Sequence, residues 1–223
     1  MKKIFSKLMA GMAFLVFSAC AAQVDEPAKF SKTVQINKLL ILPFKDMSAI
    51  YGKSNSVRCP LCGQVYLTGE VPKGAADFLT EHFTAIIKSR TDFTVIPGNH
   101  INSLLPDPAS GGVGQKSERM LLIEAVRRVG ADAVVAGYVY RFKQRVGTAY
   151  AVESSASVAF GVHMLNVSDG RMLWSAQIDE TQHPLSNNLF EIGSFFKRGA
   201  RWVTSEELAA LGLEKIFKTF PKP

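Results

Sequence analysis

The chain has 223 residues, of which 47% are hydrophobic and 20% charged, and its formal net charge is +7. This length suits about one domain with extended flanks. The apolar content is ordinary for a chain that buries a core, and it excludes a disordered or fibrous protein. No block of five or more Lys and Arg residues occurs, so the charge gives no reason to expect a nucleic-acid partner.

Residues 1–20 have the pattern of a secretory signal peptide that ends in a cysteine. Three lysines precede an uncharged, mostly apolar run over 8–17, and two small residues then precede Cys20. The apolar run is too short for a membrane-spanning helix. The pattern resembles the signal of bacterial lipoproteins. In that family the cysteine sulfur receives a diacylglycerol, the peptide is cut before the cysteine, and the new amine is acylated, with palmitate expected.

The alternative is an ordinary signal peptide with an incidental cysteine, and Phe17 stands where the lipoprotein pattern usually has Leu. On the lipoprotein interpretation, residues 1–19 are the signal peptide, 20–35 a lipidated tether, and 36–223 a periplasmic domain. Loss of the signal peptide removes three lysines, which leaves 23 basic and 19 acidic residues and a charge of about +4. By resemblance to enterobacterial lipoproteins, Ala21 favours the periplasmic face of the outer membrane.

Hydrophobic patterning of residues 36–223 predicts an α+β domain, a two-layer sandwich with a mixed sheet in the order β-α-β-α-β-β-β-α. A continuous apolar run at Leu39–Leu42 is typical of a strand buried on both faces. Apolar residues at spacings of three and four predict the helices. The expected elements are strand 36–44, helix 72–90, strand 93–96, helix 117–129, strands 132–142, 154–166 and 172–181, and a final helix starting at 204–207. The pattern over 182–198 is weaker, and a helix is expected there over 187–197.

Two local motifs fix the boundaries of the later elements. Asp169-Gly170 lies between the two long alternating segments and predicts a hairpin turn. Thr204 and Glu207 have the spacing of a capping box and predict a helix start. Since one face of the predicted hairpin is apolar and the other mostly polar, we expect helices to cover only one of its sides.

Three segments carry a resemblance to a family of envelope domains. They are ILPF at 41–44, GADAVVAGYV at 130–139 and VHMLNVSDGRMLWS at 162–175. These patterns resemble the periplasmic domain shared by the penicillin-binding-protein activators, the curli secretion lipoprotein and the N-terminal domain of TolB. The resemblance covers about residues 36–181 and consists of strand and turn patterns, so it implies a fold rather than a reaction.

The connection over 45–72 is unusually long and contains Cys59-Pro-Leu-Cys62-Gly63. At this length a connection is either functional or disordered. The motif looks like one knuckle of a zinc ribbon or rubredoxin, with two of the four ligands that a tetrahedral site needs. Histidines or a second copy of the chain could supply the others. A local disulfide, favoured by the oxidising compartment, and thiol-redox chemistry are the alternatives.

No catalytic residue is assigned. The four histidines form no zinc-protease motif, and no Gly-x-Ser-x-Gly elbow is present. His82 and His163 are expected to be structural, and no cofactor is expected, with zinc as the alternative. We therefore predict a non-enzymatic lipoprotein that is held to the membrane by lipid and binds another envelope protein or itself. A metal-binding or thiol-redox protein using Cys59 and Cys62 is the alternative function.

Overall fold

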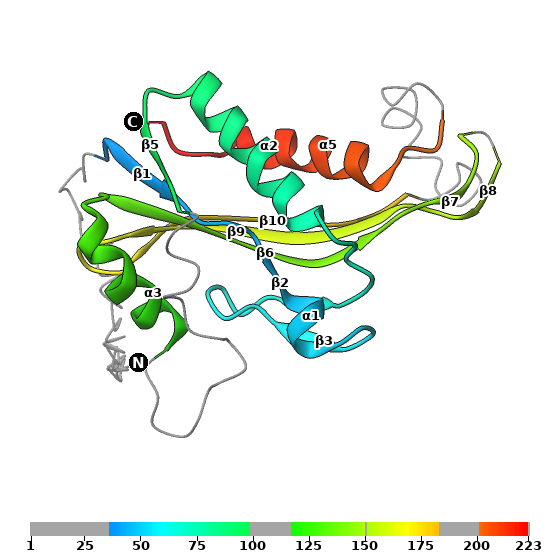
Figure 1. Ribbon diagram of the computed structural model, residues 1–223, viewed down its shortest axis with the longest axis horizontal. Coiled ribbons are helices and arrows are strands. Elements are labelled where there is room, and N and C mark those ends of the chain that lie inside the picture. The colour runs from blue at the N-terminus through cyan, green and yellow to red at the C-terminus, as the bar shows by residue number, and fades with distance from the viewer. Residues whose placement is uncertain (1–35, 99–116, 150, 183–200, 223) are drawn as a thin grey trace, which may run out of the picture. The chain divides into compact units, whose positions relative to one another are not determined.

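A six-stranded mixed sheet organises the domain (Figure 1). In the computed structural model, residues 36–98, 117–149, 151–182 and 201–222 are described. The strand order is β10-β9-β6-β1-β5, and β2 also pairs with β6. The strands are β1 (Lys38–Ile41), β2 (Lys45–Asp46), β5 (Thr94–Pro97), β6 (Ala133–Lys143), β9 (Ser157–Asn166) and β10 (Met172–Thr181).

Connection length decides which strands run parallel. The strands β5 and β6 are each linked to the preceding strand through a helix and pair in parallel with β1. The strands β6, β9 and β10 pair antiparallel, and they are linked by the short β7–β8 hairpin and by a turn. The β9–β10 turn contains Gly170 at φ 72°, a left-handed conformation that glycine adopts without strain. Two short hairpins complete the strands: β3 (Ser56–Arg58) with β4 (Val65–Leu67), and β7 (Val146–Gly147) with β8 (Val152–Ser154).

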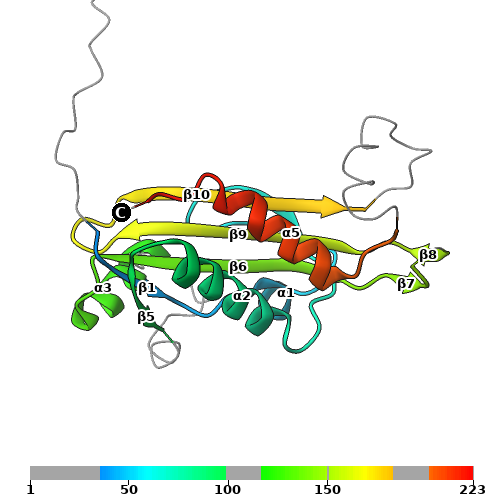
Figure 2. The ribbon, with the colours of Figure 1, turned by 90° about the horizontal axis from the view of Figure 1, so that it is seen from above.

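Two helices, α2 (Ala75–Arg90) and α5 (Ser205–Phe217), cover one face of the sheet (Figures 1 and 2). The buried face of α2 includes Leu79, Phe83 and Ile87, at spacings of four, and each such side chain contributes about 1.5–3 kcal/mol by leaving water. Helix α5 begins at Thr204 in the capping box that the sequence predicts, with both of its reciprocal hydrogen bonds formed.

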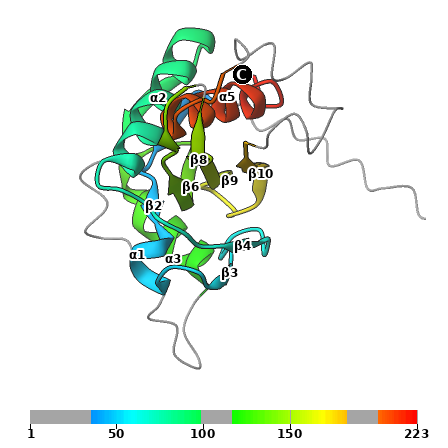
Figure 3. The same cartoon turned by 90° about the vertical axis from the view of Figure 1, so that its right-hand side faces the viewer.

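The opposite face of the sheet is also covered. Here lie α1 (Met47–Tyr51), α3 (Glu118–Val126) with the 3-10 turn η3 (Arg127–Val129), and the β3–β4 hairpin (Figure 3). These elements and the sheet enclose a second apolar cluster, which includes Met47, Tyr66 and Leu122. All ten residues of β9 are consequently buried, including those expected to form the polar face of the hairpin.

The predicted α+β class, the mixed sheet and a layer of helices, α2 and α5, packed on it are confirmed. The expectation that the other side of the β9–β10 hairpin is open does not hold, because the β3–β4 hairpin and α3 pack on that face. The strict order β-α-β-α-β-β-β-α is not confirmed, because six short elements interrupt it: β2, α1, β3, β4, β7 and β8. Four of these lie in the connection over 45–72, which is folded onto the domain. The first of the two long alternating segments, expected as one strand over 154–166, begins in β8, which ends at Ser154, and continues after a break as β9.

The signal peptide, the tether with Cys20, and the expected helix over 187–197 lie outside the described residues. Their predictions therefore stand as made from the sequence. Within the ranges described above, no helix has the length and apolar character needed to cross a membrane.

Candidate metal centre

The two cysteines of the Cys-Pro-Leu-Cys motif lie at the tip of the β3–β4 hairpin. Cys59 donates its backbone N–H to the Gln64 carbonyl oxygen at 2.7 Å, and Gly63 donates to the Cys59 carbonyl oxygen at 2.9 Å. Gly63 has φ 77°, which only glycine adopts readily. This tight turn brings both sulfurs to one side of the tip, as the sequence motif predicts.

Aromatic stacking and hydrogen bonds hold the hairpin against the sheet. The ring of Tyr66 on β4 stacks on Tyr140 of β6, with centroids 4.0 Å apart and planes within 10°. The Tyr66 hydroxyl also donates to Gln177 on β10 at 3.3 Å. Arg119 of α3 donates to the Leu61 carbonyl oxygen at 2.9 Å, within the hairpin tip itself. The hairpin is therefore held to β6 and β10 through Tyr66 and to α3 through Leu61 at its tip.

A histidine far away in sequence completes the cluster. His163 lies within β9, is fully buried, and places Nε2 3.2 Å from Cys59 Sγ. Its other ring nitrogen, Nδ1, lies 3.0 Å from Ser175 Oγ on β10. Ligand atoms of Cys59, Cys62 and His163 all lie within 4.8 Å of one another. The cluster thus joins a hairpin tip to the centre of the sheet.

Gly161, two residues before His163 on the same face of β9, leaves the imidazole its space. A Cβ atom at this position would lie 3.1 Å from His163 Nε2 and 3.2 Å from the Tyr66 hydroxyl oxygen. Both distances are shorter than ordinary van der Waals contact. A glycine inside a strand often marks such a close approach, and here it is the approach of Tyr66 and the imidazole.

The two thiols have opposite electrostatic surroundings. Burial by itself raises the pKa of the Cys59 thiol, but the hydrogen bond and charge of His163, with smaller contributions from Tyr140 and the Cys62 amide, bring it down to about 6. Burial and the neighbouring Cys59 raise the pKa of Cys62. The thiolate form is therefore favoured at the buried sulfur, and Cys62 is the exposed one.

The Tyr140 hydroxyl is the notable polar group beside the cluster. It is buried and forms no hydrogen bond of normal length and angle, although it lies near enough to Cys59 to help lower the pKa of that thiol. A buried hydroxyl without an acceptor is costly. A negatively charged sulfur beside it would provide that acceptor.

The chemistry available to this cluster is that of thiolate and imidazole ligands, or of a thiol pair. Cys59 and Cys62 are free thiols in the structure, and their assignment as disulfide or metal site remains a prediction. His163, expected to be structural, is the residue that sequence reasoning missed as a member of the site. The sequence did contain a sign of it, since Ala159 and Gly161 precede His163 on a face of β9 with small residues, where another segment can approach closely.

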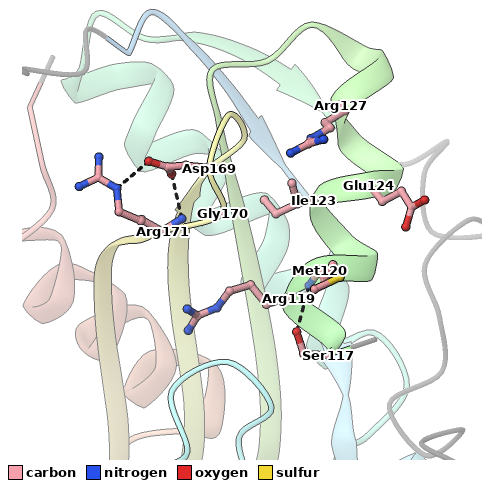
Figure 4. Close-up of a pocket in the computed structure, with 9 residues that line it drawn as sticks. All are labelled: Ser117, Arg119, Met120, Ile123, Glu124, Arg127, Asp169, Gly170 and Arg171. Atoms are coloured by element: carbon pink, nitrogen blue, oxygen red, sulfur yellow. Dashed lines mark hydrogen bonds and ion pairs between the residues drawn. The ribbon is translucent and has the colours of Figure 1, made fainter. Parts of the chain in front are cut away.

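A separate cavity of about 590 Å³ lies between α3 and the β9–β10 turn (Figure 4). Three arginines line it, but each has a partner: Arg119 donates to Leu61, Arg127 to the Ser168 carbonyl oxygen, and Arg171 to Asp169. None of the three cluster residues lines this cavity. The cavity is therefore distinct from the thiolate–imidazole cluster.

No protein-family model and no curated protein matches the chain. Among solved structures, the PelC dodecamer from Paraburkholderia phytofirmans is similar with a TM-score of 0.48 and 12% identity, over 84% of this chain and 90% of that one. The LpoB C-terminal domain from Salmonella enterica has a TM-score of 0.36 and 16% identity, over 68% and 87%. Lipoprotein GNA1162 from Neisseria meningitidis has a TM-score of 0.36 and 13% identity, over 74% and 98%.

LpoB is a penicillin-binding-protein activator lipoprotein, so the group that the sequence resembles is present among these structures. Each of these TM-scores is below 0.5, so the likenesses assign no function to this chain.

Proposed function

We propose that the protein is a membrane-anchored, non-enzymatic envelope lipoprotein that serves as a binding or assembly module for another envelope protein or for a second copy of itself. The signal pattern ending at Cys20 supports the anchor, and Ala21 supports the outer membrane. The observation that carries the binding role is the outer edge of β10.

Strand β10 is the last strand of the large sheet, and among the described strands it pairs only with β9. At about 3.4 Å per residue, its ten residues offer an edge about 34 Å long. On that edge, alternate backbone N–H and C=O groups face away from β9. A partner strand placed along it would gain main-chain hydrogen bonds, and pockets for its side chains would add specificity.

The edge of β10 has little of the usual protection against pairing. Exposed edges are commonly blocked by Lys, by Pro or by bulges; β10 contains neither Lys nor Pro, and its one irregularity lies at its start, between Met172 and Trp174. Its two acidic residues are already neutralised within the domain: Asp179 pairs with Arg141, and Glu180 with Lys215. The opposite edge strand, β5, has only four residues and ends in Pro97, which makes it a poorer template.

Site-specific crosslinking in cells tests this role. A photoreactive phenylalanine derivative is placed in the full-length chain at exposed Gln177 on β10, and, as the matched control, at exposed Lys88 on α2. We expect a discrete adduct from position 177 and none from position 88, with mass spectrometry assigning the crosslinked peptide to an envelope protein or to this chain. Equal labelling at both positions, or no adduct together with a monomeric chain in detergent, would contradict the proposal.

A further inference from the structure

The cluster at the hairpin tip carries an inference that is independent of the proposed binding role. We propose that Cys59, Cys62 and His163 bind one Zn²⁺ ion through Cys59 Sγ, Cys62 Sγ and His163 Nε2, with water as the fourth ligand. The sulfurs and the imidazole come from two elements that are 104 residues apart, so the ion would also pin the hairpin tip to the sheet.

The ligand set suits zinc. Thiolate and imidazole are the borderline-soft ligands that Zn²⁺ prefers, whereas Mg²⁺ and Ca²⁺ take oxygen ligands. Two thiolates and a neutral imidazole balance the charge of a divalent ion, which matters because Cys59 and His163 are buried. No fourth Cys, His, Asp or Glu belongs to the group within the described residues, and Cys62 is exposed, so water can reach the ion.

The best-defined pair of ligand atoms has nearly the spacing of a tetrahedral site. With zinc–sulfur bonds of about 2.3 Å and zinc–nitrogen bonds of about 2.0–2.1 Å, the sulfur and nitrogen of such a site lie about 3.5 Å apart. Cys59 Sγ and His163 Nε2 are 3.2 Å apart. All three ligand atoms lie within 4.8 Å of one another, and Cys62 is exposed, so its sulfur has room to adjust to the ion.

The surrounding groups are also those that a zinc site needs. Ser175 Oγ lies 3.0 Å from His163 Nδ1, and a hydrogen bond from Nδ1–H to this oxygen leaves the Nε2 lone pair free for the metal. The buried Tyr140 hydroxyl, which forms no normal hydrogen bond, gains an acceptor once Cys59 is a thiolate. The backbone turn at Gly63 is the knuckle form that presents both sulfurs together.

The competing interpretations fit these observations less well. A Cys59–Cys62 disulfide would leave the buried Nε2 lone pair of His163 beside a sulfur that has no proton to donate, and buried polar nitrogens are nearly always hydrogen-bonded. A redox pair attacks through an accessible sulfur, whereas Cys59, the sulfur that lies beside His163, is buried.

The test is zinc binding by the full-length chain, extracted from the envelope in detergent without added metal or reductant. Metal content and free thiols are measured first; the protein is then reduced, freed of metal, and titrated with Zn²⁺ against a chromophoric chelator. We expect one Zn²⁺ per chain. Loss of the group that hydrogen-bonds a ligating histidine lowers metal affinity by about 10–100-fold. Ser175→Ala should therefore lower zinc affinity by about that factor, and His163→Gln and Cys62→Ser should each lower it by more than about 100-fold.

The controls keep a folding defect from being mistaken for a lost ligand. His82→Gln removes an exposed imidazole elsewhere and should bind zinc like the wild type, and Cys62→Ser changes an exposed side chain. Binding of Co²⁺ to the unmodified chain, read from thiolate-to-cobalt charge-transfer and intense d–d absorption, reports the ligand type without any substitution. A Cys59–Cys62 disulfide in the extracted protein, no 1:1 zinc binding after reduction, or full affinity in His163→Gln would overturn the proposal.

Discussion

A pair of glycine substitutions on opposite faces of the sheet separates the stability of the fold from the integrity of the metal site. Gly161→Ala places a methyl group on the hairpin side, 3.1 Å from His163 Nε2 and 3.2 Å from the Tyr66 hydroxyl oxygen. Gly137→Ala places one on the helix side, 2.7 Å from three ring atoms of Phe44. Neither glycine has a positive φ, so the alanine backbone itself is unstrained.

The magnitudes follow from what each methyl group meets. Overpacking of a core costs about 1–3 kcal/mol, and replacing glycine by alanine returns about 0.4–1 kcal/mol through the unfolded chain. At position 161 the contacts are side-chain ends that need to move by a few tenths of an ångström, so the net loss should be about 0–1 kcal/mol. At position 137 the Phe44 ring is held between Phe83 and Phe160, and the net loss should be about 2 kcal/mol.

The zinc affinities should have the opposite rank. Gly161→Ala displaces the imidazole nitrogen that would bind the ion. We expect its zinc affinity to fall by about 10–100-fold, the loss seen when the groups that orient a ligating histidine are disturbed. Gly137→Ala touches only the helix side and should stay within about twofold of the wild type, provided that binding is measured well below its melting temperature.

Thermal unfolding and zinc titration of the two full-length variants provide the measurements. For a domain of this size, 1 kcal/mol shifts Tm by about 2–4 °C, so Gly137→Ala should lower Tm by about 4–8 °C and Gly161→Ala by less than about 4 °C. If Gly161→Ala bound zinc as tightly as the wild type, the assignment of His163 Nε2 as a ligand would be refuted. If Gly137→Ala were the milder variant in Tm, the packing argument at Phe44 would be wrong.

Three further predictions concern the anchor and helix α5. Cys20→Ser should abolish lipid labelling and release the chain from the membrane fraction, because two or more acyl chains are what makes anchoring stable; retention of lipid would refute the assignment. Thr204→Ala removes the acceptor for the Glu207 N–H and should lower the free energy of unfolding by about 1 kcal/mol in denaturant titrations; no change would show that the cap contributes nothing. Hydrogen bonds from Arg201 and the Thr204 amide hold the pKa of Glu207 below its usual value, so this carboxylate stabilises the fold at neutral pH and loses that effect as the pH falls through its folded-state pKa. Glu207→Gln should therefore be less stable than the wild type at pH 7 by under about 1 kcal/mol, since the ion pair is partly exposed. This gap should begin to close near the ordinary Glu value of about 4.3 and should disappear as the pH falls through the lowered folded-state pKa. A gap that does not change with pH, with Glu81→Gln as the exposed control, would refute this role.

Local patterns could predict the elements whose structure depends only on residues within the same segment. The capping box at Thr204 and Glu207 starts α5 where predicted. The alternation over 172–181 matches β10 at both ends, because side-chain period and turn chemistry at Asp169-Gly170 are local properties.

The candidate metal centre required information that no local pattern contains. Alternation placed His163 on the mostly polar side of β9, and nothing within the strand shows that the β3–β4 hairpin covers that side. The contact between Cys59 and His163 spans 104 residues, and the hairpin that makes it is held by the stacking of Tyr66 on Tyr140. The motif could therefore indicate two of the proposed ligands, and the third followed only from the folded chain.

Native mass spectrometry of the untagged protein, released from the envelope in mild detergent, tests the lipid anchor and the binding role together. The proposed function predicts a chain that begins at Cys20, has the added mass of a diacylglycerol and an acyl chain, and is bound to a second envelope protein or another copy. An unlipidated chain that appears only as a monomer, at protein concentrations matching those in the envelope, would contradict both the anchor and the binding role.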